Sequence, residues 1–191
     1  MEIRAAIPAD QPEIEAVVGA AFEEPADGRV VRMVRALDAS GATRVSLVAV
    51  DRGDVIGHVQ LSRCWVDARE ALVGVLVLSP LSIRPDRQRS GIGTALLAAA
   101  LADAERRGAP AVFLEGAWDY YGTRGFSAAV PLGFTAPSTR IPVPAFQVAL
   151  LPAYEPWMTG ALVYCDAFWT SDCVGLRDPV LAQVEQHAAR T

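Results

Sequence analysis

The sequence has few of the residues that would mark a secreted, metal-binding or membrane protein. It has only three cysteines, Cys64, Cys165 and Cys173, an odd number whose spacing fits neither a metal site nor a redox motif. No apolar run reaches the length needed to span a bilayer, and residues 1–13 lack the apolar core of a signal peptide. We therefore expect reduced thiols, a cytoplasmic location, no metal and no membrane partner.

Positive charge is also scarce. Lys and Arg total 17 against 22 Asp and Glu residues, which gives a net charge of −5. Nucleic acids and anionic membranes are bound through a surplus of positive charge, so an acidic chain is a poor match for either. We expect no nucleic-acid partner.

The residues that are present are those of a folded globular chain. Hydrophobic residues make up 52% and charged residues 20% of the 191, enough to bury one core as a single domain over residues 1–191. Residues 171–191 are expected to form a C-terminal extension with a short helix at Asp178–Ala189. Alternating and β-branched runs predict six or seven strands, at Glu2–Ala5, Val45–Val50, Val55–Val66, Leu72–Ile83, Ala111–Glu115, Ala145–Leu151 and Ala161–Tyr164.

Apolar residues at helical spacing predict about four helices around this sheet. Asp10 and Glu13 have the spacing of a capping box, which would begin a helix that runs to Phe22. Arg29–Ala39 is expected to form a second helix, and another follows the glycine loop described next. Strands alternating with helices predict an α/β (α+β) fold with a mixed central sheet.

The stretch Leu78–Arg107 organises the chain: a buried strand, a short basic loop and an amphipathic helix. The loop contains Gln88-Arg89-Ser90-Gly91-Ile92-Gly93. Glycines let the backbone turn so that successive N–H groups point at one anion, and the helix start adds further unpaired donors. Arg84, Arg87 and Arg89 add charge. The sequence therefore predicts a phosphate or pyrophosphate site.

A proline interrupts the strand that leads into this loop. Pro80 has no N–H to donate to a neighbouring strand, so pairing must fail locally at Ser79-Pro80. We expect a bulge or a splay in the middle of the sheet, immediately before the loop.

These features together resemble the GNAT superfamily of acyl-CoA-dependent N-acetyltransferases. Residues 82–97 (SIRPDRQRSGIGTALL) match its main motif, and Tyr121–Phe126 (YGTRGF) matches its Y-x-x-x-G-F segment at the expected spacing. The doubled Tyr120-Tyr121 and the segments Pro144–Phe146 and Tyr164–Phe168 are similar to a bacterial branch of predicted acetyltransferases. The resemblance covers roughly residues 1–170.

The resemblance implies a binding site for acetyl-CoA. Its pyrophosphate would lie on the loop amides of residues 88–94, and its pantetheine arm would lie in the splay and pair with backbone groups of the broken strand. The implied contacts are Leu81, Ser82, Ile83, Gln88, Arg89, Ser90, Gly91, Ile92, Gly93 and Thr94.

Tyr121 is the candidate general acid for the leaving CoA thiolate. A phenol is neutral at pH 7 and can donate a proton, and the family's donor tyrosine sits five residues before the Phe of G-F. The alternatives are that Tyr121 only packs its ring and bonds a carbonyl, or that Tyr120 is the donor.

The general base has several candidates. Glu115, at the end of a strand, could act as base or proton relay. Glu23 and Glu24 lie in an acidic loop that could bind a cationic substrate or simply be solvated. His58 could be a base or a hydrogen-bonded histidine of the sheet.

The expected function is direct transfer of acetyl from acetyl-CoA to a primary amine on a small molecule or a protein. No covalent nucleophile is evident, which favours direct attack. The alternative is a non-catalytic acyl-CoA-binding or regulatory module. The resemblance also suggests a homodimer formed through the C-terminal strands.

Overall fold

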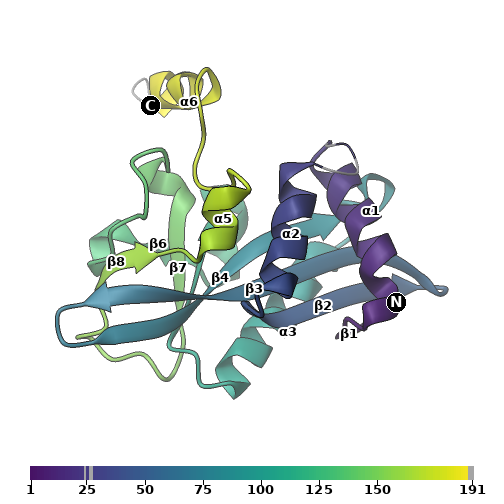
Figure 1. The fold of residues 1–191 in the computed structure, drawn as a ribbon, viewed down its shortest axis with the longest axis horizontal. Coiled ribbons are helices and arrows are strands. Elements are labelled where there is room, and N and C mark those ends of the chain that lie inside the picture. Colours follow the sequence, from purple (N-terminus) through teal and green to yellow (C-terminus); the bar gives the residue numbers. More distant parts are fainter. Residues whose placement is uncertain (24, 26–27, 189–191) are drawn as a thin grey trace.

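A mixed sheet runs through the whole molecule in the computed structural model, which describes residues 1–23, 25 and 28–188 (Figure 1). The strands in this part of the chain are β1 (Glu2–Ala5), β2 (Thr43–Asp51), β3 (Asp54–Ala68), β4 (Leu72–Ile83), β5 (Ala111–Glu115), β6 (Ser127–Ala128), β7 (Phe146–Leu150) and β8 (Gly160–Val163). The α-helices are α1 (Gln11–Ala21), α2 (Arg29–Ala39), α3 (Ile92–Arg106), α4 (Trp118–Tyr121), α5 (Asp166–Thr170) and α6 (Val180–Ala188).

The sheet has the order β1-β2-β3-β4-β5-β7-β6, with β8 paired to β3. All pairs are antiparallel except β4 and β5, which are parallel and joined by α3, as strand–helix–strand connectivity predicts. The described residues contain eight strands, against the six or seven expected. The unpredicted strand, β6, is only two residues long, too short to show any periodicity in the sequence.

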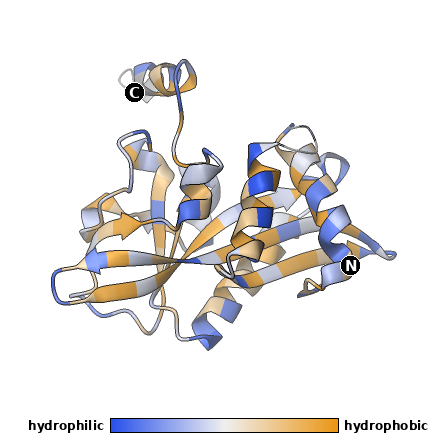
Figure 2. Cartoon of the chain, in the orientation of Figure 1, coloured by the Kyte–Doolittle hydropathy of each residue, from blue (hydrophilic) through white to orange (hydrophobic). Residues whose placement is uncertain are grey.

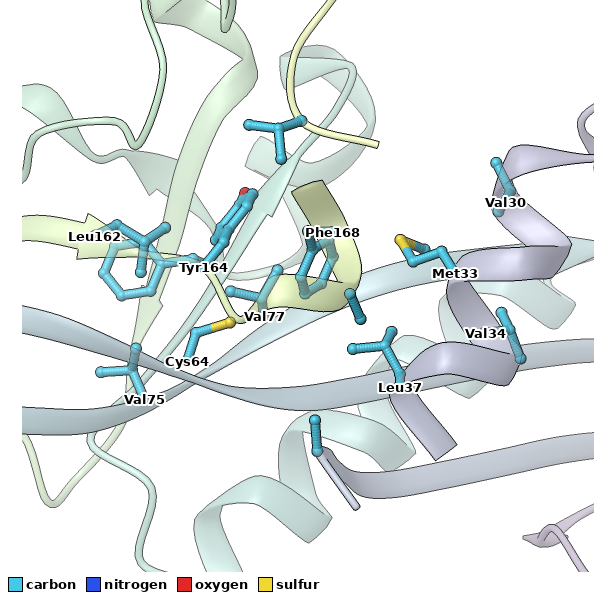
Figure 3. Close-up of a cluster of buried hydrophobic side chains, with 14 of the residues drawn as sticks. Val30, Met33, Val34, Leu37, Cys64, Val75, Val77, Leu162, Tyr164 and Phe168 are labelled. Atoms are coloured by element: carbon cyan, nitrogen blue, oxygen red, sulfur yellow. The ribbon is translucent and has the colours of Figure 1, made fainter. Parts of the chain in front are cut away.

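Helices cover both faces of the sheet. Helices α1, α2 and α5 pack on one face around a cluster that includes Met33, Val77 and Phe168 (Figure 3). Helix α3 packs on the opposite face, where Leu96 and Leu97 are buried. Helix α2 is amphipathic (Figure 2). Its valines are buried, while its arginines are exposed on the outer side of the helix.

The expected interruption of β4 is confirmed. The register of β4 against β3 shifts between Val59 and Leu61, so that the single residue between them lies opposite Ser79-Pro80. Parallel pairing with β5 is confined to Leu76 and Val77. Beyond that point β4 continues beside β3 alone, and the sheet opens on its β5 side.

The capping box expected at Asp10 is wrong. The Asp10 side chain makes no cap bond to α1. It accepts from the guanidinium of Arg4 at 2.6 and 2.8 Å and from the Ile7 N–H at 2.8 Å. Glu13 instead accepts from the Val55 N–H at 2.8 Å. Arg4 on β1, the Ile7 N–H and Val55 on β3 have replaced the pairing that the spacing predicted.

The C-terminal helix α6 begins at Val180, two residues later than expected, and stands away from the body in Figure 1. Among the described residues, no helix is both long enough and apolar enough to cross a bilayer.

The Arg4–Asp10 pair predicts a pH-dependent part of the stability. The hydrogen bonds from Arg4 lower the pKa of Asp10 to about 2, below its value of about 3.9 in an unfolded chain. The stabilisation is therefore fully present above about pH 4 and disappears as the pH falls toward 2. We expect Asp10→Asn to lower the free energy of unfolding by roughly 1–2 kcal/mol at pH 7.

Urea titrations at several pH values measure this effect. The difference between the native chain and Asp10→Asn should shrink between pH 4 and pH 2. Asp54→Asn, at the exposed first residue of β3, serves as the control for the loss of one surface carboxylate. A constant difference across that range would contradict the assignment.

Candidate functional site

The opening between β4 and β5 contains a cavity of about 710 Å³. Its walls come from the end of β4, the glycine loop, the start of α3, the end of β5 and α4. The residues that line it are Ala21, Phe22, Leu78, Ser79, Pro80, Leu81, Ile83, Arg87, Gln88, Arg89, Gly91, Ile92, Gly93, Thr94, Glu115, Gly116, Ala117, Tyr120, Tyr121 and Arg124.

The end of β4 presents backbone groups to this cavity. The Arg84 N–H donates to the Ile56 carbonyl at 3.0 Å, which makes Ile83–Gly57 a non-hydrogen-bonded pair. By the antiparallel alternation, the N–H and C=O groups of Leu81 and Ile83 point away from β3 and toward the cavity. The side-chain amide of Gln88 donates to the Ile83 carbonyl at 3.3 Å.

Ser82 lies between these two residues, and by the same alternation its backbone groups point toward β3. It pairs with His58 on β3 and is fully buried, and it does not line the cavity. Ser90 does not line the cavity either, and its hydroxyl donates to the Arg87 carbonyl. The other residues expected to contact the cofactor all line the cavity.

The glycine loop has the backbone of an anion site. Arg89 and Gly91 both have left-handed backbone angles, with φ of 60° and 86°, and alternation of this kind turns successive N–H groups toward one concavity. Helix α3 begins at Ile92, so the unpaired N–H groups of its first turn continue the same surface.

Gly93 matters for close packing rather than for its backbone angle. A Cβ at this position would lie 2.6 Å from the Tyr120 hydroxyl oxygen. The absence of a side chain lets Tyr120 rest against the start of α3.

The three arginines around the loop differ in their surroundings. Arg84 is bound to Asp86 at 2.6 and 3.1 Å, and Arg87 lies 3.2 Å from Asp51. Arg89 is exposed and lines the cavity. The positive charge available at the loop is therefore smaller than three arginines suggest, because acidic side chains fold back onto two of them.

Arg124 is a further cation of this cavity that was not among the predicted site residues. Its guanidinium carbon lies 4.0 Å from the centre of the Tyr120 ring, and its Nε donates to the Thr94 hydroxyl at 2.9 Å. The signal for it was its place inside the segment YGTRGF, next to the predicted donor tyrosine.

Both candidate tyrosines line the cavity. Their rings meet edge to face with centroids 4.9 Å apart, and Tyr121 also packs on Phe126. Burial raises the pKa of Tyr121 to about 12. The phenol is therefore protonated at neutral pH and available as a proton donor.

Glu115 lies between this cavity and a second one of about 210 Å³. The two cavities share Phe22, Leu78, Ser79 and Glu115, and among the described residues Glu115 is the one ionisable side chain that lines both. Its carboxylate accepts from the Tyr164 hydroxyl and from the Gly175 N–H, each at 2.9 Å. Burial raises the pKa of Glu115, while these two bonds and the charge of Arg140 act in the opposite direction.

The remaining candidate bases have different positions. Glu23 is exposed and lines neither cavity, although its neighbour Phe22 lines both. Glu24 lies outside the described residues. His58 is fully buried in the sheet, with Nε2 3.0 Å from the Ser46 hydroxyl, and burial lowers its pKa to about 4. It lines neither of these cavities.

Within the described part of the chain, no cluster of three or more His, Cys, Asp or Glu side chains could hold a metal ion. The three cysteines are not joined in disulfides. The arrangement therefore consists of a glycine loop with the backbone of an anion site, an open strand edge, a protonated phenol and a partly buried carboxylate, which together suit proton transfer beside a phosphate-bearing ligand.

The sequence and the structure of this chain are similar to those of known proteins. Residues 13–126 match the family described as the Acetyltransferase (GNAT) family. The structure is similar to that of YhbS, a GNAT family N-acetyltransferase from Escherichia coli in complex with CoA, at a TM-score of 0.77 and 27% identity. That match covers 87% of this chain and 91% of the other.

A second similar structure is a GNAT family acetyltransferase from Brucella melitensis in complex with acetyl-CoA. It has a TM-score of 0.70 and 33% identity, and the match covers 87% of this chain and 97% of that one. No curated protein sequence matches the chain.

The loop geometry predicts binding of a bare diphosphate. We expect inorganic pyrophosphate to shift the amide resonances of residues 88–94 in a ¹⁵N NMR titration, because their N–H groups supply the site. Gly91→Glu should abolish these shifts by adding a negative charge at the loop.

Gly108→Glu is the matched control. Gly91 and Gly108 flank the two ends of α3, both have left-handed backbone angles, and both have open space where a Cβ would lie. The strain is therefore comparable while only Gly91 lies in the loop. Equal loss of binding in both variants would count against the loop as the anion site.

Proposed function

The chain belongs to the GNAT acetyltransferase family, and from that premise we propose that it moves the acetyl group of acetyl-CoA directly to a primary amine. Family membership supports acyl transfer from acetyl-CoA. The single observation that supports direct transfer to an amine is the position of Glu115, which lines both cavities.

The larger cavity fits acetyl-CoA. The amides of residues 88–94 would hold the pyrophosphate, and the backbone groups of Leu81 and Ile83 would pair with the pantetheine arm as an added strand does. The bound thioester supplies an activated acyl carbon and a thiolate leaving group. Arg89 and Arg124 add positive charge to the lining of this cavity.

The smaller cavity is the proposed acceptor site. An alkyl ammonium has a pKa near ~10.4 and must lose a proton before it can attack. Glu115 lines both the acceptor cavity and the cofactor cavity, and its carboxylate takes that proton. Glu23 and Glu24 remain candidates for attracting a cationic acceptor toward this region, although Glu23 does not line the cavity.

Tyr121 supplies the second proton. As the amine nitrogen forms its bond to the acyl carbon, the carbon–sulfur bond breaks and the sulfur leaves with the electron pair. Tyr121 gives its phenolic proton to that sulfur, whose thiol should have a pKa near ~8.5 like that of cysteine. The nitrogen carries a positive charge once it has bonded to the acyl carbon, and it gives its second proton to the Tyr121 phenolate. The products are an N-acetyl amide and neutral CoA thiol, Tyr121 is a phenol again, and Glu115 releases the first proton to solvent. Tyr120 is the alternative donor.

Direct transfer is favoured over a covalent acyl-enzyme. Cys173 is the one thiol that lines either cavity within the described residues. Its Sγ–H donates to the Ser171 carbonyl at 3.5 Å, a bond that stabilises the neutral thiol rather than the nucleophilic thiolate.

An assay of thiol release from acetyl-CoA tests the proposal. The acceptor panel holds polyamines, amino acids, aminoglycosides and lysine peptides. The chain contains no lysine, so its own side chains offer no primary amine and any thiol release above hydrolysis reports the added acceptor. We expect acceptor-dependent release with at least one class. Acetyl-CoA binding without release for any amine would favour a non-catalytic acyl-CoA-binding module.

The role of Tyr121 predicts a separation of rate from affinity. We expect Tyr121→Phe to lower kcat about 10²-fold, the size of general acid catalysis, while acetyl-CoA affinity measured by calorimetry is little changed. Tyr120→Phe is the matched control and should keep most of kcat. An unaltered kcat in Tyr121→Phe with a large loss in Tyr120→Phe would transfer the role to Tyr120.

A further inference from the structure

The segment that follows β8 reaches back to Glu115. Tyr164, the first residue after the strand, donates its hydroxyl to one carboxylate oxygen at 2.9 Å. Gly175 donates its backbone N–H to the other oxygen, also at 2.9 Å. Both oxygens of Glu115 are therefore held by groups 49 and 60 residues away in the sequence.

Tyr164 is held in place by packing in the hydrophobic core. Its side chain is only 4% exposed, and its ring lies 4.7 Å from that of Phe168, centroid to centroid. Figure 3 shows the ring between Leu162 and Phe168, within the cluster that joins α2 and α5 to the sheet. A hydroxyl carried on a ring packed in this way has little freedom to leave Glu115.

Gly175 is fixed by its backbone. Its φ is +62°, and a Cβ at this position would lie 2.6 Å from the carbonyl carbon and oxygen of Arg140. The next residue, Leu176, donates its N–H to that same carbonyl at 2.9 Å. Only a glycine lets the chain approach Arg140 closely enough to aim this amide at Glu115.

We propose that Tyr164 and the Gly175 amide are positioning groups that hold the Glu115 carboxylate between the two cavities, oriented to receive the acceptor's proton. The C-terminal segment is thereby part of the catalytic apparatus. This inference rests on the proposed role of Glu115 as the base. Neither group touches the substrate, and both act through Glu115.

The electrostatics follow from this geometry. Burial alone disfavours the charged carboxylate, and the two hydrogen bonds stabilise that charged form. Arg140 also lowers the pKa of Glu115 through its charge. The other charged or titratable groups that line the two cavities with Glu115 and Tyr164 are Arg29, Arg87, Arg89, Arg124, Asp172, Tyr120, Tyr121 and Cys173. Removal of the Tyr164 hydroxyl leaves all of these in place, so the remaining balance favours protonation.

The test is Tyr164→Phe, read by two independent measurements. The first is a ¹³C NMR titration of selectively labelled glutamate side chains in the full chain, with Glu115 assigned by its absence in Glu115→Gln. We expect the pKa of Glu115 to rise by about one unit, the size of one hydrogen bond to a charged group. The second is the pH profile of kcat with the best acceptor of the panel, whose acidic limb should move up by the same amount.

Two further variants serve as a control and as a second test. Tyr154→Phe is the matched control, because Tyr154 packs near Phe134 and its hydroxyl has no hydrogen-bond partner among the described residues; it should leave the acidic limb unmoved. Gly175→Ala tests the second holder without altering Tyr164, and should also move the limb upward. Unchanged acetyl-CoA affinity shows that each variant is folded.

The outcomes separate this inference from the function it rests on. If the Glu115 pKa and the acidic limb stay in place in both Tyr164→Phe and Gly175→Ala, while Glu115→Gln loses the limb, the positioning role is overturned and the base stands. If Glu115→Gln keeps full kcat at every pH, the base itself is overturned and the positioning role with it. A matched upward shift in both measurements supports the inference.

Discussion

The site depends on the point where β4 stops pairing with β5. Parallel pairing covers only Leu76 and Val77, and the residues that follow, Ser79-Pro80, form a bulge against β3. Because proline has no N–H to donate, the ladder cannot be continued there. The free edge of β4, the cavity beside it and the direction in which the chain enters the glycine loop all follow from this single break.

The opening between β4 and β5 has two different linings, one on the side of the glycine loop and one on the side of α2 and the C-terminal segment. On the loop side, N–H groups and arginines create a surface for anions. On the side of α2 and the C-terminal segment, the smaller cavity is lined by apolar groups such as Phe168, by the charged Arg29 and Asp172, and by the partly buried carboxylate of Glu115. Glu115 reaches both sides because β5 ends where the two strands separate. A proton can therefore be handled at the point where an acceptor and an acyl donor would meet.

Most of the elements could be predicted from the sequence, because the hydrophobic periodicity of a long segment can be recognised from neighbouring residues alone. The three long strands and the helices α1, α2 and α3 lie where hydrophobic periodicity placed them, and the break at Pro80 follows from the chemistry of one residue. Short or locally ambiguous features were lost: β6 has two residues, and the cap at Asp10 was displaced by Arg4, which comes from β1. Whether Ser82 faces β3 or the cavity could not be predicted, because strand alternation cannot be assigned a side without knowing the register.

By itself, the sequence determined the loop and its function class. The conformation of the glycine loop and the start of the helix after it depend on a few neighbouring residues, so the local sequence is enough to predict them. Only the tertiary structure decided what surrounds the reacting groups. It brought Arg124 to Thr94, folded Asp51 onto Arg87, and closed Tyr164 and Gly175 on Glu115. These contacts join residues from 30 to 60 positions apart, and the strand register and packing that create them leave no mark in the local pattern of residues.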